Sequence, residues 1–225
     1  MSIHCNPKIV SKNLLVYLDA ANKKSYPKYG LEYWGDISDQ GNHFSMYGNL
    51  INDSNSFVFS GNVANYFYSD TFNNHPTTEL TIEMWVLPDV NSTQDTFYSF
   101  ISDNLTNHYI SDQSNLTISG PNFTVNTNKS IIDGKWKHLV RTSLRNTGVE
   151  KLYINGNIEF EEVLSPSILF NQTGNILLGQ RPDNTEILNP NYSYLGNIAI
   201  FKMYTKVLTE DEIKQNFNAL KGKFL

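Results

Sequence analysis

The chain has little of what marks several common protein classes. It holds a single cysteine, Cys5, among 225 residues, so no intramolecular disulfide can form and stability must come from core burial. No apolar run approaches the length of a membrane span, and the opening residues MSIHCNPK lack the basic and apolar regions of a signal peptide. Charged residues make up only 17% of the chain and the net charge is -5. We therefore expect neither nucleic acid nor a membrane as a partner.

Motifs of catalysis and of metal binding are also missing. The sequence contains no nucleophile elbow, no zinc-binding spacing and no phosphate loop. Glycosidase chemistry needs two carboxylates on one face, about 5 to 9 Å apart, and no expected strand supplies such a pair. Glu83 is followed two positions later by Trp85, and the acidic run 210–212 is explained by a helix start, where the dipole favours carboxylates. The sequence predicts a protein that is not an enzyme and has no metal ligand set.

Aromatic residues, by contrast, make up 13% of the chain and are spread along it, and Asn, Ser and Thr crowd the gaps between short apolar runs. This composition is typical of many short strands joined by polar turns. We expect strands at residues 14–19, 56–60, 65–69, 80–87, 97–102, 108–111, 116–119, 123–127, 136–144, 149–154, 158–163, 175–180 and 194–204. A helix pattern follows only the last of them. The pattern predicts an all-β, two-layer antiparallel sandwich or jelly roll with one short C-terminal helix.

The closing segment predicts that helix in detail. Thr209 and Glu212 have the spacing of a capping box, and Leu208 precedes the helix as the outer residue of a hydrophobic staple. Gly222 can end the helix in the left-handed conformation. The apolar residues of the helix share one face and are Ile213, Phe217 and Leu220. We therefore expect the helix to lie on an apolar surface.

Two strands can be analysed face by face. The segment 80–87 is apolar on both parities, so it must be a central strand that is covered on both sides. In the segment 136–144 the even positions are mostly apolar, whereas Lys137 and Arg141, continued by Arg145, form a charged face that we expect to be wet. His138 shares the apolar parity, which favours a hydrogen-bonded structural histidine.

A hairpin is predicted at Asn155-Gly156. A two-residue loop would place Ile158 and Phe160 on the wetter face. A three-residue loop with Gly156 left-handed would place them beside the inward-facing residues of the preceding strand, and we favour it. It also sets Glu159 and Glu161 near the basic positions, so that cross-strand charge pairing explains the basic cluster better than anion binding does.

Seven segments, taken in order, resemble a known family. They are YLDAANKKSYP (17–27), WGDISDQGNH (34–43), LTIEMWVLPD (80–89), WKHLV (136–140), LYINGNI (152–158), NILLGQR (175–181) and the closing strand and helix. The chain resembles the laminin-G-like branch of the concanavalin A-like lectin/glucanase superfamily over residues 14 to 224. The resemblance implies a two-sheet antiparallel jelly roll, with an N-terminal arm at 1–13 and one domain at 14–225.

The two ends of the domain carry a second resemblance. The opening LDAAN and SYP and the closing QNFNALKG are similar to the form of this domain found in structural proteins of tailed bacteriophages. This implies a virion protein, assembled in the host cytoplasm and exposed outside the cell. It also implies a homo-oligomer or many copies on one particle, with other virion proteins or glycans as partners.

Calcium is the cation that the resemblance raises, because many relatives bind it at the rim of the sandwich through hard oxygen ligands. Where relatives carry an acidic pair before the last helix, this chain has Ala199 and Ile200, which puts such a site in doubt. The oxygen-bearing residues of the early loops that could gather are Asp19, Asn22, Asp36, Asp39 and Asn42. Asx turns are the alternative explanation for these residues, and we expect no cofactor.

Sugar recognition needs an exposed aromatic platform beside planar amides or carboxylates. The loop 181–194, RPDNTEILNPNYSY, has these ingredients. Its candidate carbohydrate-binding residues are Asp183, Asn184, Asn189, Tyr192 and Tyr194. An early loop with Tyr26, Tyr29, Tyr33 and Trp34 has them too, although packing explains Trp34 better.

Two functions remain open on this basis. In the first, the domain is a non-catalytic lectin-like surface protein that binds glycans or a host surface weakly and gains strength from many copies. In the second, it is an architectural decoration or cement protein of a capsid or tail with no sugar site. Solvent-facing tyrosines at the rim would favour the first, and a large apolar patch or an ordered N-terminal arm would favour the second.

Overall fold

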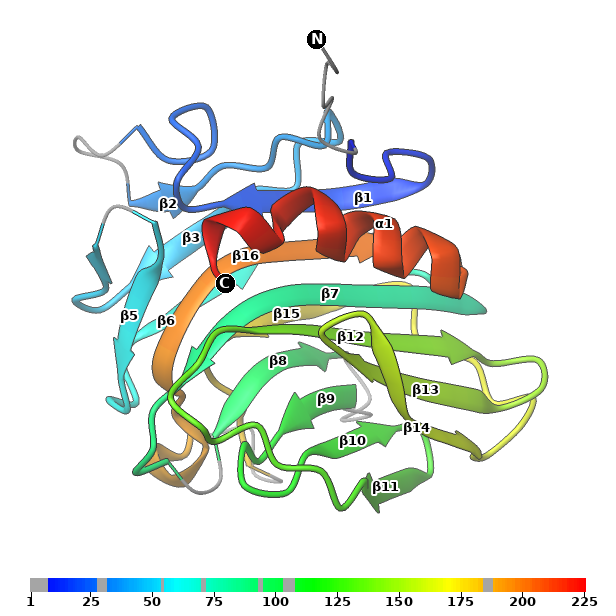
Figure 1. Ribbon diagram of the computed structural model, residues 1–225. Coiled ribbons are helices and arrows are strands. Elements are labelled where there is room, and N and C mark those ends of the chain that lie inside the picture. Colours follow the sequence, from blue (N-terminus) through cyan, green and yellow to red (C-terminus); the bar gives the residue numbers. More distant parts are fainter. Residues whose placement is uncertain are drawn as a thin grey trace, which may run out of the picture.

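The structure of the chain, a computed structural model, describes residues 8–27, 32–53, 55–69, 72–92, 95–102, 108–183 and 188–225. Its strands form two sheets of eight strands each. Neighbouring strands pair antiparallel throughout these residues. The all-β antiparallel sandwich with one short C-terminal helix is confirmed (Figure 1).

The first sheet, sheet A, is built around two ten-residue strands, β7 and β16. Its spatial order is β14 (Asn157–Val163), β13 (Val149–Ile154), β12 (Lys137–Leu144), β7 (Glu79–Pro88), β16 (Leu195–Tyr204), β5 (Phe57–Ser60) and β4 (Ile51–Asn52), and β1 (Leu14–Asp19) also pairs with β16. Strands β5 and β1 share one edge of β16, because β5 pairs with its first half and β1 with its second half.

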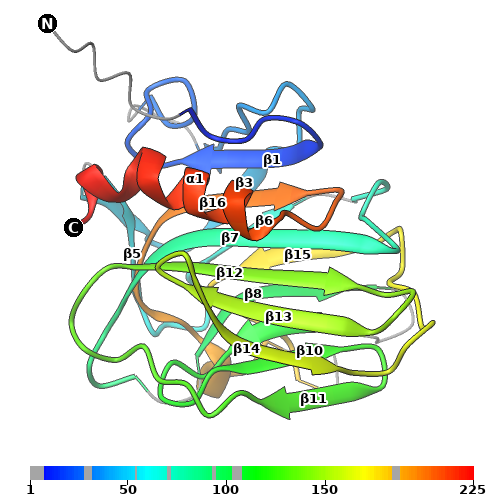
Figure 2. The same cartoon turned by 45° about the vertical axis from the view of Figure 1, so that its right-hand side comes forward.

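The second sheet, sheet B, lies behind sheet A in the view of Figure 2. Its spatial order is β11 (Phe123–Asn126), β10 (Thr117–Gly120), β9 (His108–Ser111), β8 (Thr96–Ile101), β15 (Asn175–Leu178), β6 (Tyr66–Ser69), β3 (Phe44–Tyr47) and β2 (Tyr33–Trp34). The chain crosses between the sheets several times, for example from β5 to β6, from β6 to β7 and from β7 to β8. This repeated crossing is the connectivity of a jelly roll.

Every strand expected from the sequence is present, and β1, β9 and β13 have the predicted bounds. The other predicted strands differ by one or two residues at their ends. Three strands were missed, namely β2, β3 and β4. Two of them have only two residues each, too few to show any alternation of apolar and polar side chains.

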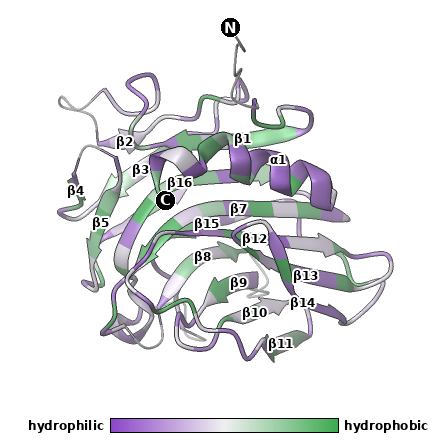
Figure 3. Cartoon of the chain, viewed as in Figure 1, coloured by the Kyte–Doolittle hydropathy of each residue, from purple (hydrophilic) through white to green (hydrophobic). Residues whose placement is uncertain are grey.

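The main core lies between the two sheets. From sheet A it receives alternate residues of β7, which are Leu80, Ile82, Met84 and Val86. From sheet B it receives a set of aromatic rings, which are Phe44, Phe67, Phe97, Tyr98 and Phe100. Figure 3 shows the mixed hydropathy of the strands, as expected where one side chain points into the core and the next points out.

The outer face of sheet A is covered by helix α1 (Glu210–Leu220), which lies over β16 and β7 in Figures 1 and 2. Trp85 of β7 stacks on Phe217 of the helix and on Phe224, with ring centroids 5.9 and 4.4 Å apart. Ile213 and Leu220 are buried on the same side. The prediction that the segment 80–87 is covered on both faces is therefore confirmed.

The ends of this helix agree with the sequence in part. The capping box is present: the Thr209 hydroxyl accepts from the Glu212 amide at 3.3 Å, and the Glu212 carboxylate accepts from the Thr209 amide at 3.0 Å. The prediction for Gly222 is wrong, because this glycine does not adopt a positive φ. Instead the last turn tightens into a short 3-10 helix, Lys221–Lys223. Continued winding brings Phe224 onto Trp85, a contact that a left-handed stop would not give.

The N-terminal arm, where it is described, packs against this helix. The Val10 amide donates to Asn216 Oδ1 at 2.7 Å, and its carbonyl accepts from the Tyr204 hydroxyl at 3.2 Å. The Lys8 carbonyl accepts from Gln215 Nε2 at 2.6 Å. Val10 and Ile9 contribute apolar contacts to the same layer. These residues of the arm are used within the domain, and residues 1–7 lie outside the described chain.

Beneath the helix lies a buried ionic cluster. Lys202 Nζ is 2.7 Å from Glu83 Oε1, and His138 Nε2 is 3.0 Å from the same oxygen. Asn216 Nδ2 donates to Glu83 Oε2 at 2.6 Å, and the Tyr204 hydroxyl lies 3.5 Å from it. Burial raises the pKa of Glu83, but the charge of Lys202 and the contact with His138 outweigh it and hold this pKa at about 2. His138 is thus a buried structural histidine, and its partner is a carboxylate.

The prediction of a wet face on β12 is wrong. Arg141 and Arg145 are 1% and 0% exposed. Val140 faces the helix layer, whereas Leu139 belongs to the core between the sheets, and Arg141 shares its parity. Apolar and charged side chains do alternate along β12 as predicted. Both faces of sheet A are covered in this region, so the charged face points into the sandwich and not into water.

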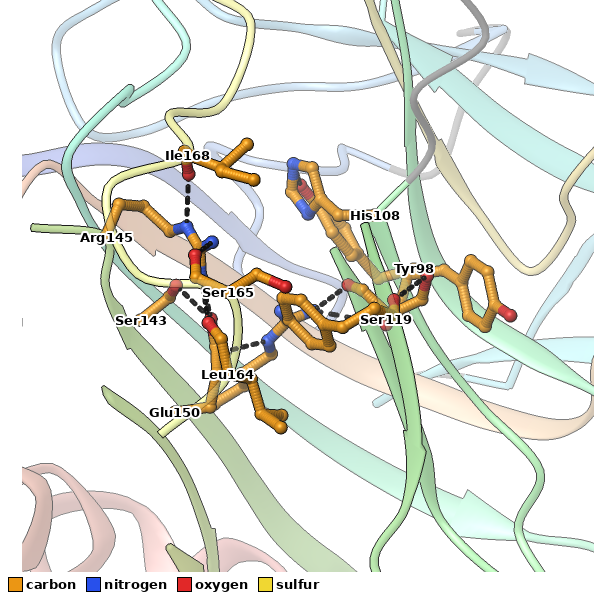
Figure 4. Close-up of polar contacts among 12 residues, drawn as sticks. Tyr98, His108, Ser119, Ser143, Arg145, Glu150, Leu164, Ser165 and Ile168 are labelled. Atoms are coloured by element: carbon orange, nitrogen blue, oxygen red, sulfur yellow. Dashed lines mark hydrogen bonds and ion pairs between the residues drawn. The ribbon is translucent and has the colours of Figure 1, made fainter. Parts of the chain in front are cut away.

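Arg141 and Arg145 are held by one carboxylate, that of Glu150 on β13 (Figure 4). Arg141 Nε lies 3.0 Å from Glu150 Oε2, and Arg145 Nη1 lies 2.9 Å from Glu150 Oε1. The Ser143 hydroxyl also donates to this carboxylate. Other N–H groups of the same two guanidiniums donate to carbonyls of sheet B and of the segment after β14. Arg141 donates to those of Tyr109 and Ser119, and Arg145 donates to those of Leu164, Ser165 and Ile168. The network therefore joins the two sheets.

Charge pairing does account for the predicted basic and acidic positions, but with other partners. Glu161 pairs with Lys151 at 3.1 Å, and Glu159 pairs with Lys129 at 2.9 Å. Both pairs are partly exposed, which makes each worth only about 0 to 1 kcal/mol. The stronger pairing lies inside, at Glu150.

The hairpin between β13 and β14 has a two-residue loop, so the prediction of three residues is wrong. Ile154 pairs with Asn157, and both Asn155 and Gly156 have positive φ, 52° and 79°. Tyr153 therefore faces Ile158. A bulge then shifts the register by one residue, so that Phe160 lies opposite Leu152 as predicted. The bulge therefore supplies, further along the strand, the one-residue register shift that the longer loop was expected to supply at the turn.

No helix within the described residues is long and apolar enough to cross a bilayer.

The Glu150 network predicts a large difference between a buried and an exposed charge. Glu150→Gln removes the countercharge of two buried guanidinium groups, and we expect it to lower the free energy of unfolding by about 3 to 5 kcal/mol. Glu161→Gln on the neighbouring strand is the matched control, with an expected loss below about 1 kcal/mol. Urea unfolding at pH 7 measures both. Similar losses for the two variants would show that the network does not join the sheets.

The Glu83 cluster predicts a pH dependence of stability. The pKa of Glu83 is about 2 in the folded protein, against an ordinary value of 4.5 for a solvated glutamate. A depressed pKa stabilises the folded state fully above the unfolded value, and this stabilisation is lost as the pH falls from about 5 towards 2. It amounts to about 3 kcal/mol. Urea unfolding between pH 7 and pH 3 should therefore show a steeper loss in the wild type than in Glu83→Gln. Parallel curves would contradict the assignment.

Candidate functional site

The face of sheet B that points away from sheet A carries an aromatic surface. Along β6 the side chains alternate, so that Phe67 lies in the core while Tyr66 and Tyr68 are partly exposed on the other face. Tyr47 of β3 lies directly opposite Tyr66 in the register. The two rings stack with centroids 4.8 Å apart and an angle of 6° between their planes. Tyr68 contacts Tyr47 edge-on at 6.1 Å.

Next to these tyrosines the surface is hollowed. A pocket of about 550 Å³ opens over strands β6, β15 and β8. Its described lining residues are Tyr66, Tyr68, Ile101, Ser102, Asn175, Leu177, Pro182 and Leu188. We call it the tyrosine pocket. Its volume lies within the range of about 300 to 1,000 Å³ that is usual for small-molecule sites.

The floor of the tyrosine pocket follows from strand register. Leu177 of β15 pairs with Tyr68, and Asn175 pairs with Ile101 of β8. These neighbours share one face because side chains directly opposite in antiparallel strands point the same way. Asn175 is oriented by its amide nitrogen, which donates to the Ser69 carbonyl at 3.2 Å. One wall comes from the first half of the predicted loop 181–194, where Pro182 and Leu188 form an antiparallel bridge.

The electrostatics of the tyrosine pocket are those of a binding surface. Its described lining offers phenol and alcohol hydroxyls, an amide and aromatic carbons, and no Asp, Glu, His, Lys or Arg side chain. Burial and the neighbouring Tyr47 raise the pKa of Tyr66, so its hydroxyl stays protonated near neutral pH. Such a lining can stack on an apolar ring face and exchange hydrogen bonds with hydroxyl groups.

The structure separates the residues predicted in the loop 181–194. Asp183 follows Pro182 at the wall of the pocket and is partly buried. Asn184 lies outside the described residues. Asn189 uses its side-chain oxygen to accept from the Asn191 amide at 2.9 Å, so it caps the short helix η1 (Pro190–Tyr192).

The two tyrosines of the loop have different roles. The guanidinium carbon of Arg181 lies 3.5 Å from the centre of the Tyr192 ring and 4.2 Å from the centre of the Tyr109 ring. This contact fixes the loop against β9. Tyr194 is only 1% exposed, and its hydroxyl donates to the carbonyls of Leu87 and Asn197. Tyr194 is therefore a core residue, and its ring is not available to a ligand.

The early loops use their oxygen atoms internally. Both carboxylate oxygens of Asp36 accept hydrogen bonds, from the amides of Tyr17, Ser38 and Asn42 and from the Ser38 hydroxyl. Asp19 and Asn22 likewise accept from amides two residues ahead. These are the Asx turns that were the alternative to calcium binding. Across the described residues no three His, Cys, Asp or Glu side chains gather as a metal site.

Comparison with known proteins now identifies the family. A laminin-G-type model, described as the concanavalin A-like lectin/glucanases superfamily, matches residues 60–214. The chain belongs to this superfamily. No curated protein sequence matches it.

Among solved structures, the binding domain of Paraclostridial Mosquitocidal Protein 1 is similar, with a TM-score of 0.67 and 17% identity over 93% of this chain and 52% of that one. The binding domain of botulinum neurotoxin DC is also similar. In complex with rat synaptotagmin II it gives a TM-score of 0.68 and 18% identity over 94% of this chain and 52% of that one. In complex with SialylT the same binding domain gives a TM-score of 0.68 and 16% identity over 93% of this chain and 52% of that one. The chain thus spans about half of each toxin chain, and these likenesses show a shared fold.

The buried carboxylates of the described residues do not form the catalytic pair of a glucanase. Glu83 and Glu150 are completely buried, and each is bound to cations. Neither lines the tyrosine pocket. A glycosidase requires two carboxylates that flank the substrate. The fold is that of the concanavalin A-like lectin/glucanases superfamily.

Sequence reasoning missed the main elements of the tyrosine pocket. The signal was present in YFYS (66–69), where tyrosine alternates with a core phenylalanine. Alternation of this kind places two phenol rings on one outward face. Asn175 and Leu177 show the same parity in β15. The pattern became informative only once the structure showed that β3, β6 and β15 are neighbours.

Proposed function

We propose that the chain is a non-catalytic glycan-binding module and that the tyrosine pocket holds the sugar. The observation that carries this proposal is the lining itself, in which two tyrosines, an asparagine and a serine surround a hollow of sugar size. Apolar ring faces and hydroxyl groups are the two surfaces that a monosaccharide presents, and the lining complements both. The solved relatives support the proposal, because one of them is a binding domain in complex with SialylT.

The architectural alternative loses one of its supports. An ordered N-terminal arm that is free to contact other proteins would favour the architectural function. Ile9 and Val10 of the arm instead pack on the domain's own helix layer. The large apolar residues that are exposed among the described ones are scattered over several elements: Tyr33, Tyr47, Ile51, Val90, Ile158, Val163, Leu169 and Leu225. Scattered single residues do not form a docking patch. We therefore retain glycan binding as the primary function.

We further propose that the domain is displayed in many copies on the surface of a phage particle. The support is the resemblance of its opening and closing segments to structural proteins of tailed phages. One shallow pocket gives weak binding, and many copies on one particle raise the total strength by about 10² to 10⁴. Protein partners on that particle, and self-association, belong to the same proposal.

Tyr66→Ala tests the sugar site. We expect it to weaken binding on a glycan array, and in titration with the best-bound sugar, by at least about tenfold, because it removes the stacking platform. Tyr33→Ala is the matched control, since Tyr33 is also a partly exposed tyrosine of sheet B but does not line the pocket. Tyr192→Ala should have a smaller effect than Tyr66→Ala, because Tyr192 acts through Arg181. Silence of the wild type across the array would overturn the proposal.

Immunogold labelling of particles from the source tests the virion proposal. We expect regularly spaced labels on the surface and recovery of the chain with purified particles in fixed stoichiometry. Recovery only in the soluble fraction would count against a particle location while leaving the sugar site untouched.

A further inference from the structure

A second polar cluster lies inside the sandwich, away from the tyrosine pocket. His75, from the segment between β6 and β7, and His108, at the start of β9, face each other with their Nε2 atoms 3.1 Å apart. The Tyr98 hydroxyl of β8 lies 3.4 Å from each of these nitrogens. All three residues are at most 2% exposed. Neither the fold nor the proposed sugar site accounts for this arrangement.

Two of the three spacings are long for hydrogen bonds, and all three suit the ligands of one ion. Hydrogen bonds from hydroxyl or ring N–H groups are usually about 2.7 to 3.2 Å long, so the two contacts of Tyr98 exceed this range. Ligands in a tetrahedral shell with bonds of about 2.0 to 2.1 Å lie about 3.3 Å apart. The three separations in the cluster, 3.1, 3.4 and 3.4 Å, bracket this value.

The two imidazole rings are closest at their Nε2 atoms. The ring centroids of His75 and His108 are 4.8 Å apart, whereas their Nε2 atoms are 3.1 Å apart. The rings therefore approach each other towards the nitrogens.

The surroundings hold the three groups in place. Phe100 stacks on His75 at 3.9 Å, and Phe170 lies on His108 at 4.4 Å.

We propose that His75, His108 and Tyr98 form a structural site for a transition-metal ion that prefers imidazole, with Zn²⁺ as the ion to test. Binding forms bonds from the ion to two Nε2 atoms and to the Tyr98 oxygen, whose proton leaves to solvent. This inference departs from the sequence analysis, which found no zinc-binding spacing. The site was invisible there because its ligands come from three separate segments, and tyrosine is not a residue by which such spacings are recognised.

Two positive side chains stand near the site. Arg141 and Arg145 act on His108, and they share the carboxylate of Glu150. The negative charge that Tyr98 gains on losing its proton offsets part of the charge of the ion. The ion would tie β8, β9 and the entry to β7 together inside the sandwich, and burial of all three ligands makes the role structural rather than catalytic.

Metal content and thermal stability of the full chain test this proposal. The protein, stripped with a chelator and returned to Zn²⁺, is expected to retain about one equivalent by elemental analysis. An excess of about 100 times the dissociation constant should raise Tm by about 5 to 10 °C. Co²⁺ should give visible absorption bands of a tetrahedral site. Less than about a tenth of an equivalent, with no shift in Tm, would overturn the proposal.

Variants locate the ion. Tyr98→Phe keeps the ring and removes one ligand, and should weaken Zn²⁺ binding at least tenfold, while Tyr194→Phe removes another buried hydroxyl as the matched control. His108→Gln should abolish binding, with His43→Gln as its control. Cys5→Ser, which removes the only thiol of the chain, should bind as the wild type does. If His108→Gln fails to fold, Tyr98→Phe decides alone. Wild-type affinity in Tyr98→Phe would place the ion elsewhere and refute the site.

Discussion

Burial of sheet A on both faces is the constraint on which the rest of the structure depends. Sheet B covers one face and helix α1 covers the other, so the central residues of β7, β12 and β16 are shielded from water. A buried charge is tolerated only with a partner. Glu83 therefore requires Lys202, and Glu150 requires its two arginines. The helix and the buried ion pairs are consequences of the same covering.

This covering also decides where a ligand can bind. The outer face of sheet A is occupied by α1 and by the N-terminal arm from Lys8 onward. The outer face of sheet B has no such helix among the described residues, and only the loop that begins at Arg181 lies over part of it. An exposed antiparallel face usually carries polar side chains. Here β3 and β6 carry tyrosines, so the open face can bind the apolar side of a ligand as well as its hydroxyl groups.

The sequence predicts what depends on local pattern. Alternation and turn residues gave the strands, and the spacing of Thr209 and Glu212 gave the helix cap, because these signals act over a few neighbouring residues. The errors lie where a distant segment decides. Arg141 looked solvated because its alternation with apolar residues is that of a half-buried strand, and only the position of β13 supplies Glu150. Gly222 lies in a 3-10 turn and not in a left-handed stop, and the residue that follows this turn, Phe224, stacks on Trp85, far away in sequence.

The candidate site follows the same rule. The composition of the loop 181–194 predicts a sugar site, but composition does not distinguish Tyr192, which lies on an arginine, from Tyr194, which lies in the core. The tyrosine pocket, by contrast, is assembled by register across β3, β6, β15 and β8. Strand β8 has a further part in it, because Ile101 lines the pocket on one face while Tyr98 and Phe100 lie in the core on the other. Whatever fixes Tyr98 inside therefore also fixes the floor of the pocket outside, since both side chains belong to one short strand whose backbone moves as a unit.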